Sequence, residues 1–168
     1  MGTKRAEMPG TQDMDRLSIN TIRTLAMDAV QRANSLADAP GGKPDVLLLA
    51  TGSEVALSVQ AFEELSAEGV KARVVSMPSW ELFDRQEPAY RESVIPSAVK
   101  ARVCVEQAST LGWDRFAGPS GEIIGMRAFG ASAPQKELQK KFGFVPERIA
   151  AAAREQIAKT AKRGRKGA

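Results

Sequence analysis

The sequence contains no histidine, which limits the chemistry that its side chains can perform. Imidazole-based metal sites, serine–histidine–aspartate triads and cysteine–histidine pairs all need this residue, so each of them is excluded. Catalysis would have to rest on carboxylates, lysines, Tyr90 or Cys104. Cys104 lies in the apolar run ARVCVEQ, a pattern typical of a small core residue on a strand rather than of a reactive thiolate.

The segment SMPSWELFDRQE places three carboxylates close together, at Glu81, Asp84 and Glu87. A pair of carboxylates can perform acid–base catalysis, but solvated surface charge is the simpler interpretation of this spacing. Trp80 and Phe83 in the same segment predict either an exposed interaction patch or a lid over the sheet edge, with equal weight. A tryptophan farther along, in TLGWDRF, is interpreted as a packing anchor and not as a base-stacking platform.

The turn ATGSE is the main candidate for a ligand site. Thr51, Gly52 and Ser53 join an apolar run to a helical pattern, and backbone N–H groups at such a turn can bind a phosphate. The spacing matches neither the dinucleotide glycine motif nor the P-loop. Thr51 and Glu54 have the spacing of a capping box, which would place a carboxylate where an anion would sit. A structural turn is therefore favoured over a phosphate site, and the phosphate turn is kept as the weaker alternative.

Alternating strand and helix patterns surround this turn. Apolar runs predict strands at 45–51, 70–76, 102–107 and 121–130, and the first of these is apolar enough to be covered on both faces of a parallel sheet. Helical spacing predicts helices at 53–69, 87–96, 133–143 and 145–163. The alternation predicts a three-layer α/β/α domain with a mostly parallel sheet and right-handed crossovers.

A further amphipathic helix is expected before this domain. Its apolar stripe comprises Ile19, Ile22, Ala26, Ala29, Val30 and Ala33. The Pro- and Gly-containing segment LADAPGGKP then indicates a boundary. The predicted organisation is a polar lead and helix over 1–35, a linker over 36–44, an α/β domain over 45–157 and a basic tail over 158–168.

Composition and charge restrict the partners. The chain of 168 residues has a net charge of +4, but Lys159, Lys162, Arg163, Arg165 and Lys166 lie together in the tail, and the rest of the chain is close to neutral. Such a tail would give weak, salt-sensitive affinity for nucleic acid without aromatic stacking, so a nucleic-acid partner is not favoured. No apolar stretch is long enough to cross a bilayer and no signal-peptide pattern is present, so a soluble, cytoplasmic protein is expected.

Several motifs together resemble one family. The segments ATGSEV, SMPSWELFDRQ, YRESVIP and FGASAP, within about residues 45–157, resemble the C-terminal domain of transketolase. The earlier helix INTIRTLAMDAVQRANS resembles the opening helix of the first, diphosphate-binding domain of the same family. The resemblance implies a truncated transketolase-family chain in which the linker joins two pieces that are distant in the full enzyme.

The resemblance implies little activity for this chain alone. Transketolases transfer a two-carbon ketol unit between sugar phosphates with thiamine diphosphate and Mg²⁺. The family's metal-binding Gly-Asp-Gly segment, its pyrimidine-binding domain and the His-Pro-Gly after the opening helix are not found, since Leu36, Ala37 and Asp38 follow that helix. We therefore expect no catalytic residue, no metal ligand, no bound cofactor and a structural or regulatory role. The expected partner is a second copy or a companion transketolase chain, and a phosphate-binding or partner-complementing module is the alternative.

Overall fold

The computed structural model describes residues 37–38 and 42–166, and its core is a five-stranded sheet. The strands are β1 (Ala37–Asp38), β2 (Val46–Ala50), β3 (Ala72–Ser76), β4 (Arg102–Ser109) and β5 (Glu122–Met126). The helices are α2 (Glu54–Ala67), α3 (Trp80–Asp84), α4 (Pro88–Val94), α5 (Asp114–Ala117), α6 (Gln135–Phe142) and α7 (Pro146–Lys166).

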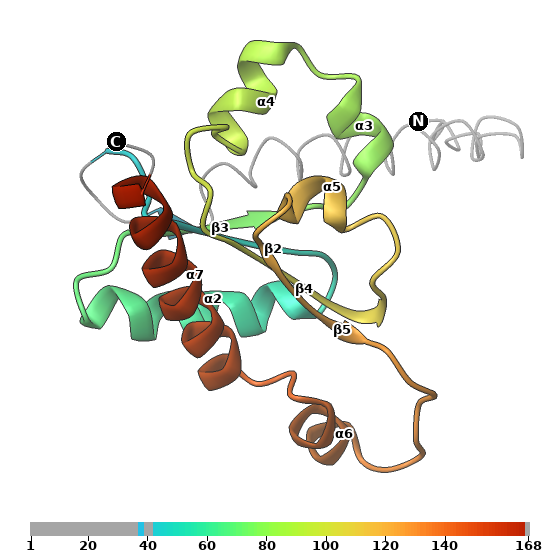
Figure 1. The fold of residues 1–168 in the computed structure, drawn as a ribbon. Helices are drawn as coiled ribbons and strands as arrows, with labels where there is room; N and C mark the ends of the chain where they lie inside the picture. Colours follow the sequence, from blue (N-terminus) through green and yellow to red (C-terminus); the bar gives the residue numbers. More distant parts are fainter. Residues whose placement is uncertain (1–36, 39–41, 167–168) are drawn as a thin grey trace, which may run out of the picture.

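The sheet has the order β1-β3-β2-β4-β5, and β2 through β5 are parallel. β2 is the central strand, and all five of its residues are buried because helices cover both faces of the sheet (Figure 1). The short β1 pairs antiparallel with β3 and closes one edge, with Ala37 opposite Val74. β5 forms the opposite edge of the described sheet.

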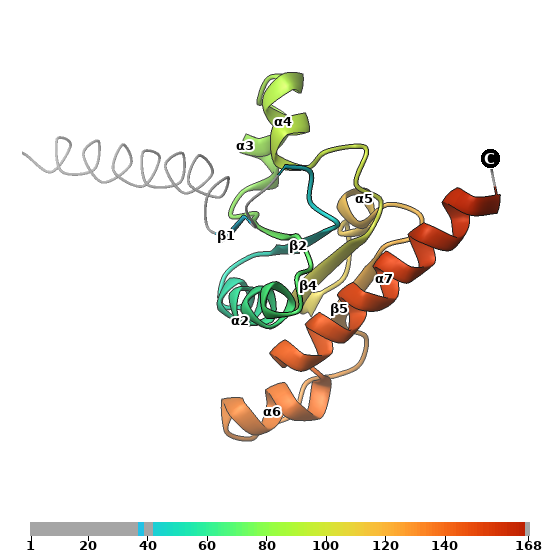
Figure 2. The same cartoon turned by 90° about the vertical axis from the view of Figure 1, so that its left-hand side faces the viewer.

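Helices form a layer on each side of this sheet (Figures 1 and 2). α2 and α7 cover one face, where alternate strand residues such as Leu48 and Val103 pack against Leu65 and Ile149. α3, α4 and α5 cover the other face, where Leu49 and Cys104 belong to a second apolar cluster. The predicted three-layer α/β/α architecture is confirmed.

The predicted helices and strands of the α/β domain are all present, and their ends follow local chemistry. α2 ends before Gly69, which has a φ of +79° and lets the chain turn back into β3. Pro146 occupies the first turn of α7, where the missing N–H costs nothing. α7 continues to Lys166, so the basic segment after Ile157 extends this helix within the described residues.

The segment before β2 was predicted to contain a helix and a linker. The expected N-terminal helix and its apolar stripe lie outside the described residues. The predicted linker contains β1, which the sequence did not indicate, because a two-residue strand leaves no periodic pattern. Along the described part of the chain, no helix is both long and apolar enough to cross a membrane.

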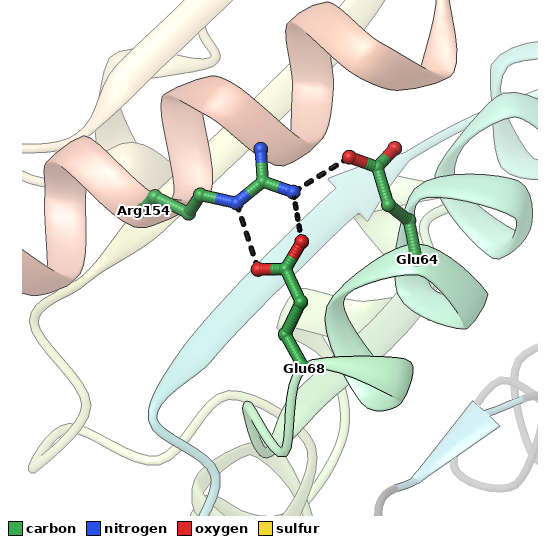
Figure 3. A network of polar contacts seen from close by, with 3 residues as sticks. All are labelled: Glu64, Glu68 and Arg154. Carbon is green, nitrogen blue, oxygen red and sulfur yellow. Dashed lines mark hydrogen bonds and ion pairs between the residues drawn. The ribbon is translucent and has the colours of Figure 1, made fainter.

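Arg154 links the two helices of one layer. Its guanidinium on α7 reaches the carboxylates of Glu64 and Glu68 at the end of α2 (Figure 3). Arg154 and Glu64 are 90 residues apart in sequence, so the contact links two distant segments at the surface of this layer, whose buried apolar residues form its core.

Candidate functional site

The strand order places a topological switch point at β2. The chain runs from β2 to β3 on one side and then crosses to β4 on the other side. In parallel α/β sheets, ligands bind outside the carboxyl ends of the strands at this type of switch. The loops that follow β2 and β4 therefore define the candidate site, and the turn ATGSE is one of them.

A carboxylate fills the turn after β2. Glu54 is only 5% exposed, and its Oε1 accepts a hydrogen bond of 2.9 Å from the Ser53 hydroxyl. Its Oε2 lies 3.5 Å from the position that a side-chain carbon on Gly52 would occupy. This oxygen atom thus lies directly against the turn, as the sequence predicted. A second anion at this position would be repelled by the carboxylate.

The backbone of the turn is already engaged in the first turn of α2. The N–H groups of Glu54, Val55 and Ala56 donate to the carbonyl oxygens of Thr51, Gly52 and Ser53, at 3.3, 3.4 and 3.2 Å. These three donors would otherwise be the ones offered to a phosphate. The geometry thus gives no support to a phosphate site at Thr51, Gly52 and Ser53, which remains an untested prediction.

The predicted capping box is wrong in its details. The N-cap residue of α2 is Ser53 rather than Thr51, and no side chain caps the helix start. The physical reason is that the Ser53 hydroxyl bonds to the neighbouring carboxylate of Glu54 instead of a backbone N–H.

The loop after β4 is closed by an aromatic cluster. Trp113 is 1% exposed, and its ring lies 5.1 Å from that of Trp80 at an angle of 85°. Its indole N–H donates to Glu106 at 3.3 Å, which satisfies the polar end of a buried ring. Phe83 and Phe116 belong to the same cluster. Trp113 is thus a packing anchor, and the structure places Trp80 and Phe83 as a lid over the sheet rather than as an exposed patch.

The other candidate residues do not form a catalytic group. Cys104 is fully buried, and burial raises the pKa of its thiol to about 12. Asp84 pairs with Arg115 on the surface, and Glu81 accepts a hydrogen bond from the Ser79 hydroxyl at 3.3 Å. Burial raises the pKa of Tyr90, which packs near Phe83. Over residues 37–38 and 42–166, no cluster of acidic or cysteine side chains could hold a metal ion.

Two large apolar side chains stand out in the loops at this end of the sheet. Leu111, after β4, is 84% exposed, and Phe129, after β5, is 98% exposed. Because parallel strands end at the same edge, both side chains lie on the carboxyl edge of the sheet. We call them the carboxyl-edge apolar pair. Sequence reasoning missed them, because an apolar residue beside a glycine in a short loop does not reveal whether it is buried.

The comparisons with known proteins agree with this fold. The family model for the transketolase-like C-terminal domain matches residues 33–145. The chain belongs to the transketolase family. This confirms the resemblance found in the sequence.

Individual transketolases show how much of the family the chain represents. Transketolase 7 from Craterostigma plantagineum is 54% identical over 113 residues, which cover 67% of this chain and 17% of the relative. The structure of transketolase from Leishmania mexicana matches with a TM-score of 0.66 and 39% identity, over 73% of this chain and 18% of that one. The matched region therefore spans about a sixth of the length of these two transketolases.

A third match concerns the fold alone. A structure described as a split gene transketolase, an inactive beta4 tetramer, has a TM-score of 0.53 and 23% identity, over 70% of this chain and 40% of that one.

The described residues do not fit thiamine diphosphate and Mg²⁺, the cofactors that the resemblance implies for the family. The chain has no histidine, and the described part has no cluster of carboxylates for a metal. The turn at the switch point already carries the Glu54 carboxylate, which would oppose a diphosphate. No catalytic step is therefore assigned to this domain.

Proposed function

We propose that this chain acts as the non-catalytic C-terminal domain of a transketolase assembly, and that a companion transketolase chain supplies the cofactor-binding domains. In this role the chain contributes structure to the assembly and performs no ketol transfer by itself.

The observation that carries the proposal is the exposure of Leu111 and Phe129. Single exposed apolar residues are common on protein surfaces, whereas exposed apolar side chains on neighbouring loops can together form an interaction surface. Both lie at the carboxyl edge, where α/β domains meet their ligands and neighbouring domains. A docked partner would remove both side chains from water.

Two further findings support a structural role. The match covers 17% of transketolase 7 from Craterostigma plantagineum, so most of that transketolase lies outside the matched region. The residues that sequence reasoning considered for chemistry are engaged in packing or in surface ion pairs.

A docking experiment tests the proposal. The purified chain is mixed with a transketolase from which the C-terminal domain has been removed, and complex formation is followed by sedimentation velocity. We expect a stable complex that Phe129→Glu and Leu111→Glu each weaken at least about tenfold, because a buried charge at an apolar contact is costly. Ala98→Glu is the matched control. Ala98 is exposed and precedes β4, so it lies at the amino ends of the parallel strands, opposite Leu111 and Phe129.

The outcomes distinguish the partners. Self-association that Phe129→Glu removes would show that the same surface pairs two copies of this chain. A complex that forms equally well with all three variants would show that the carboxyl-edge apolar pair is not the docking surface. Absence of any complex would contradict the proposal.

A further inference from the structure

The β5 edge of the sheet carries a groove that the transketolase role does not use. Its volume is about 550 Å³, and it runs along the β5 backbone from Ser120 to Gly125 beside α7. Arg127, Arg148, Gln156 and Lys159 also line it. We call it the β5–α7 groove. It is distinct from the carboxyl-edge apolar pair, because neither Leu111 nor Phe129 lines it.

Open backbone groups form one side of this groove. β5 pairs with β4 on its inner side, and it is the last strand of the described sheet. An edge strand presents alternate N–H and C=O groups that another extended chain can satisfy. At the opposite edge of the described sheet, the short β1 pairs with two residues of β3.

The charges in the groove are mainly positive. Arg127, Arg148 and Lys159 contribute three cations, and Glu122 contributes one carboxylate. Glu122 accepts a hydrogen bond of 2.7 Å from Arg148, and Lys159 forms an exposed ion pair of 3.4 Å with Glu155, one turn away on α7. Two of the three cations are therefore partly compensated, and the groove lining keeps a net positive charge. A second copy of this chain would bring the same cations to the contact and be repelled, whereas a segment with carboxylates would be attracted.

One residue that lines the groove is a buried polar side chain. Gln156 on α7 is 2% exposed, and its Oε1 has no hydrogen-bond partner. A buried carbonyl oxygen without a donor lowers stability. A side-chain hydroxyl or amide of a segment seated in the groove would be a suitable donor. Apolar residues of similar size would be more stable at this position in the absence of such a segment.

We propose that the β5–α7 groove binds an extended acidic peptide segment, which adds a strand to β5. The backbone of the segment pairs with β5, and its carboxylates contact Arg127, Arg148 and Lys159. A hydroxyl or amide side chain that points toward α7 satisfies Gln156. This mode of recognition derives affinity from backbone hydrogen bonds and specificity from alternate side chains.

The test uses the full chain and labelled peptides. The probe is a capped eight-residue peptide that alternates threonine with valine and carries a glutamate at each end. The first control has lysine at both ends, and the second keeps the glutamates but has prolines in the centre, which prevent strand pairing. Binding is measured by fluorescence anisotropy, and the β5 amides are followed by hydrogen exchange. We expect the acidic peptide to bind at least about tenfold more tightly than either control and to protect β5.

Variants localise the binding. The double variant Arg127→Glu and Lys159→Glu should weaken the acidic peptide about tenfold or more, because it reverses two of the groove charges. The double variant Lys43→Glu and Lys100→Glu makes the same change in net charge away from the groove and should leave affinity unchanged. Gln156→Met should keep or raise the melting temperature of the free chain, yet weaken the threonine-containing peptide several-fold.

Three results would overturn the inference. Equal affinity for the acidic and lysine-ended peptides would show that the cations of the groove do not select an acidic segment. Equal affinity for the proline peptide, without protection of β5, would show binding without strand addition. Displacement of the peptide by a few millimolar inorganic phosphate alone would show that the groove binds anions without recognising a peptide backbone.

Discussion

Arg154 on α7 donates two hydrogen bonds to the carboxylate of Glu68 at the end of α2. Its Nε donates to one carboxylate oxygen at 3.0 Å and its Nη2 to the other at 2.6 Å (Figure 3). Hydrogen bonds from Arg154 lower the pKa of the Glu68 carboxyl below its usual value. A two-point contact between a guanidinium and a carboxylate fixes geometry better than a single ion pair.

This contact predicts a pH-dependent contribution to stability. Because the pKa of Glu68 is lowered in the folded state, the contribution is complete above the unfolded pKa and disappears as the pH falls through the folded value. Arg154→Gln should therefore lower the melting temperature near pH 7 but have little effect in strong acid. The control is Arg163→Gln, an exposed position on the same helix. A difference in melting temperature between wild type and Arg154→Gln that stays constant from pH 7 to pH 2 would show that the Glu68 carboxylate does not contribute to stability through Arg154.

Gly112 is predicted to be essential for the aromatic lid. It has a φ of +82°, and a side-chain carbon there would lie 2.8 Å from the Trp80 ring. Gly112→Ala should cost about 2 to 4 kcal/mol of unfolding free energy, from backbone strain and the clash together. Gly69→Ala is the matched control, because Gly69 also has a positive φ but faces open space. It should cost only about 1 kcal/mol. Urea unfolding measures both variants. If Gly112→Ala and Gly69→Ala lower the free energy of unfolding equally, the contact with Trp80 does not contribute to the cost.

Cys104 should be unreactive in the native chain. A shift in the pKa of its thiol from 9.0 to about 12 lowers the thiolate fraction at pH 8 about a thousandfold, and burial also blocks access. Native protein should react with a thiol-specific disulfide reagent only through unfolding, whereas urea-unfolded protein should react within minutes. Rapid stoichiometric labelling of the folded chain would place this thiol in a reactive site.

The turn at Thr51, Gly52 and Ser53 should not respond to phosphate compounds. The Glu54 carboxylate occupies the turn, so a sugar phosphate should leave the melting temperature of the chain unchanged. A rise that Ser53→Glu abolishes would instead identify the turn as a phosphate site.

The central part of the fold could be predicted from the sequence because local patterns and tertiary burial agree there. The run at 45–51 is apolar at every strand position and became the central strand, and Gly69 ended α2 as its position indicated. β1 could not be predicted, since its pairing with β3 depends on a long-range contact.

The candidate site was harder to predict than the fold. The glycine turn and its carboxylate follow from local spacing, so their arrangement was largely expected. The exposure of Phe129 depends on how the loop after β5 leaves the sheet, and the β5–α7 groove depends on the packing of α7. Neither leaves a signal in a single sequence, because loop phenylalanines are usually buried and glutamines are usually exposed, the reverse of what Phe129 and Gln156 do here.

Calorimetric titration of thiamine diphosphate with Mg²⁺ into the purified chain tests the central claim most directly, with an intact transketolase as the positive control. If the chain is a structural domain that depends on a companion for cofactor binding, the titration should give no saturable heat under conditions where the control binds. Saturable binding by this chain alone would mean that it holds a cofactor site, and it would contradict the proposed role.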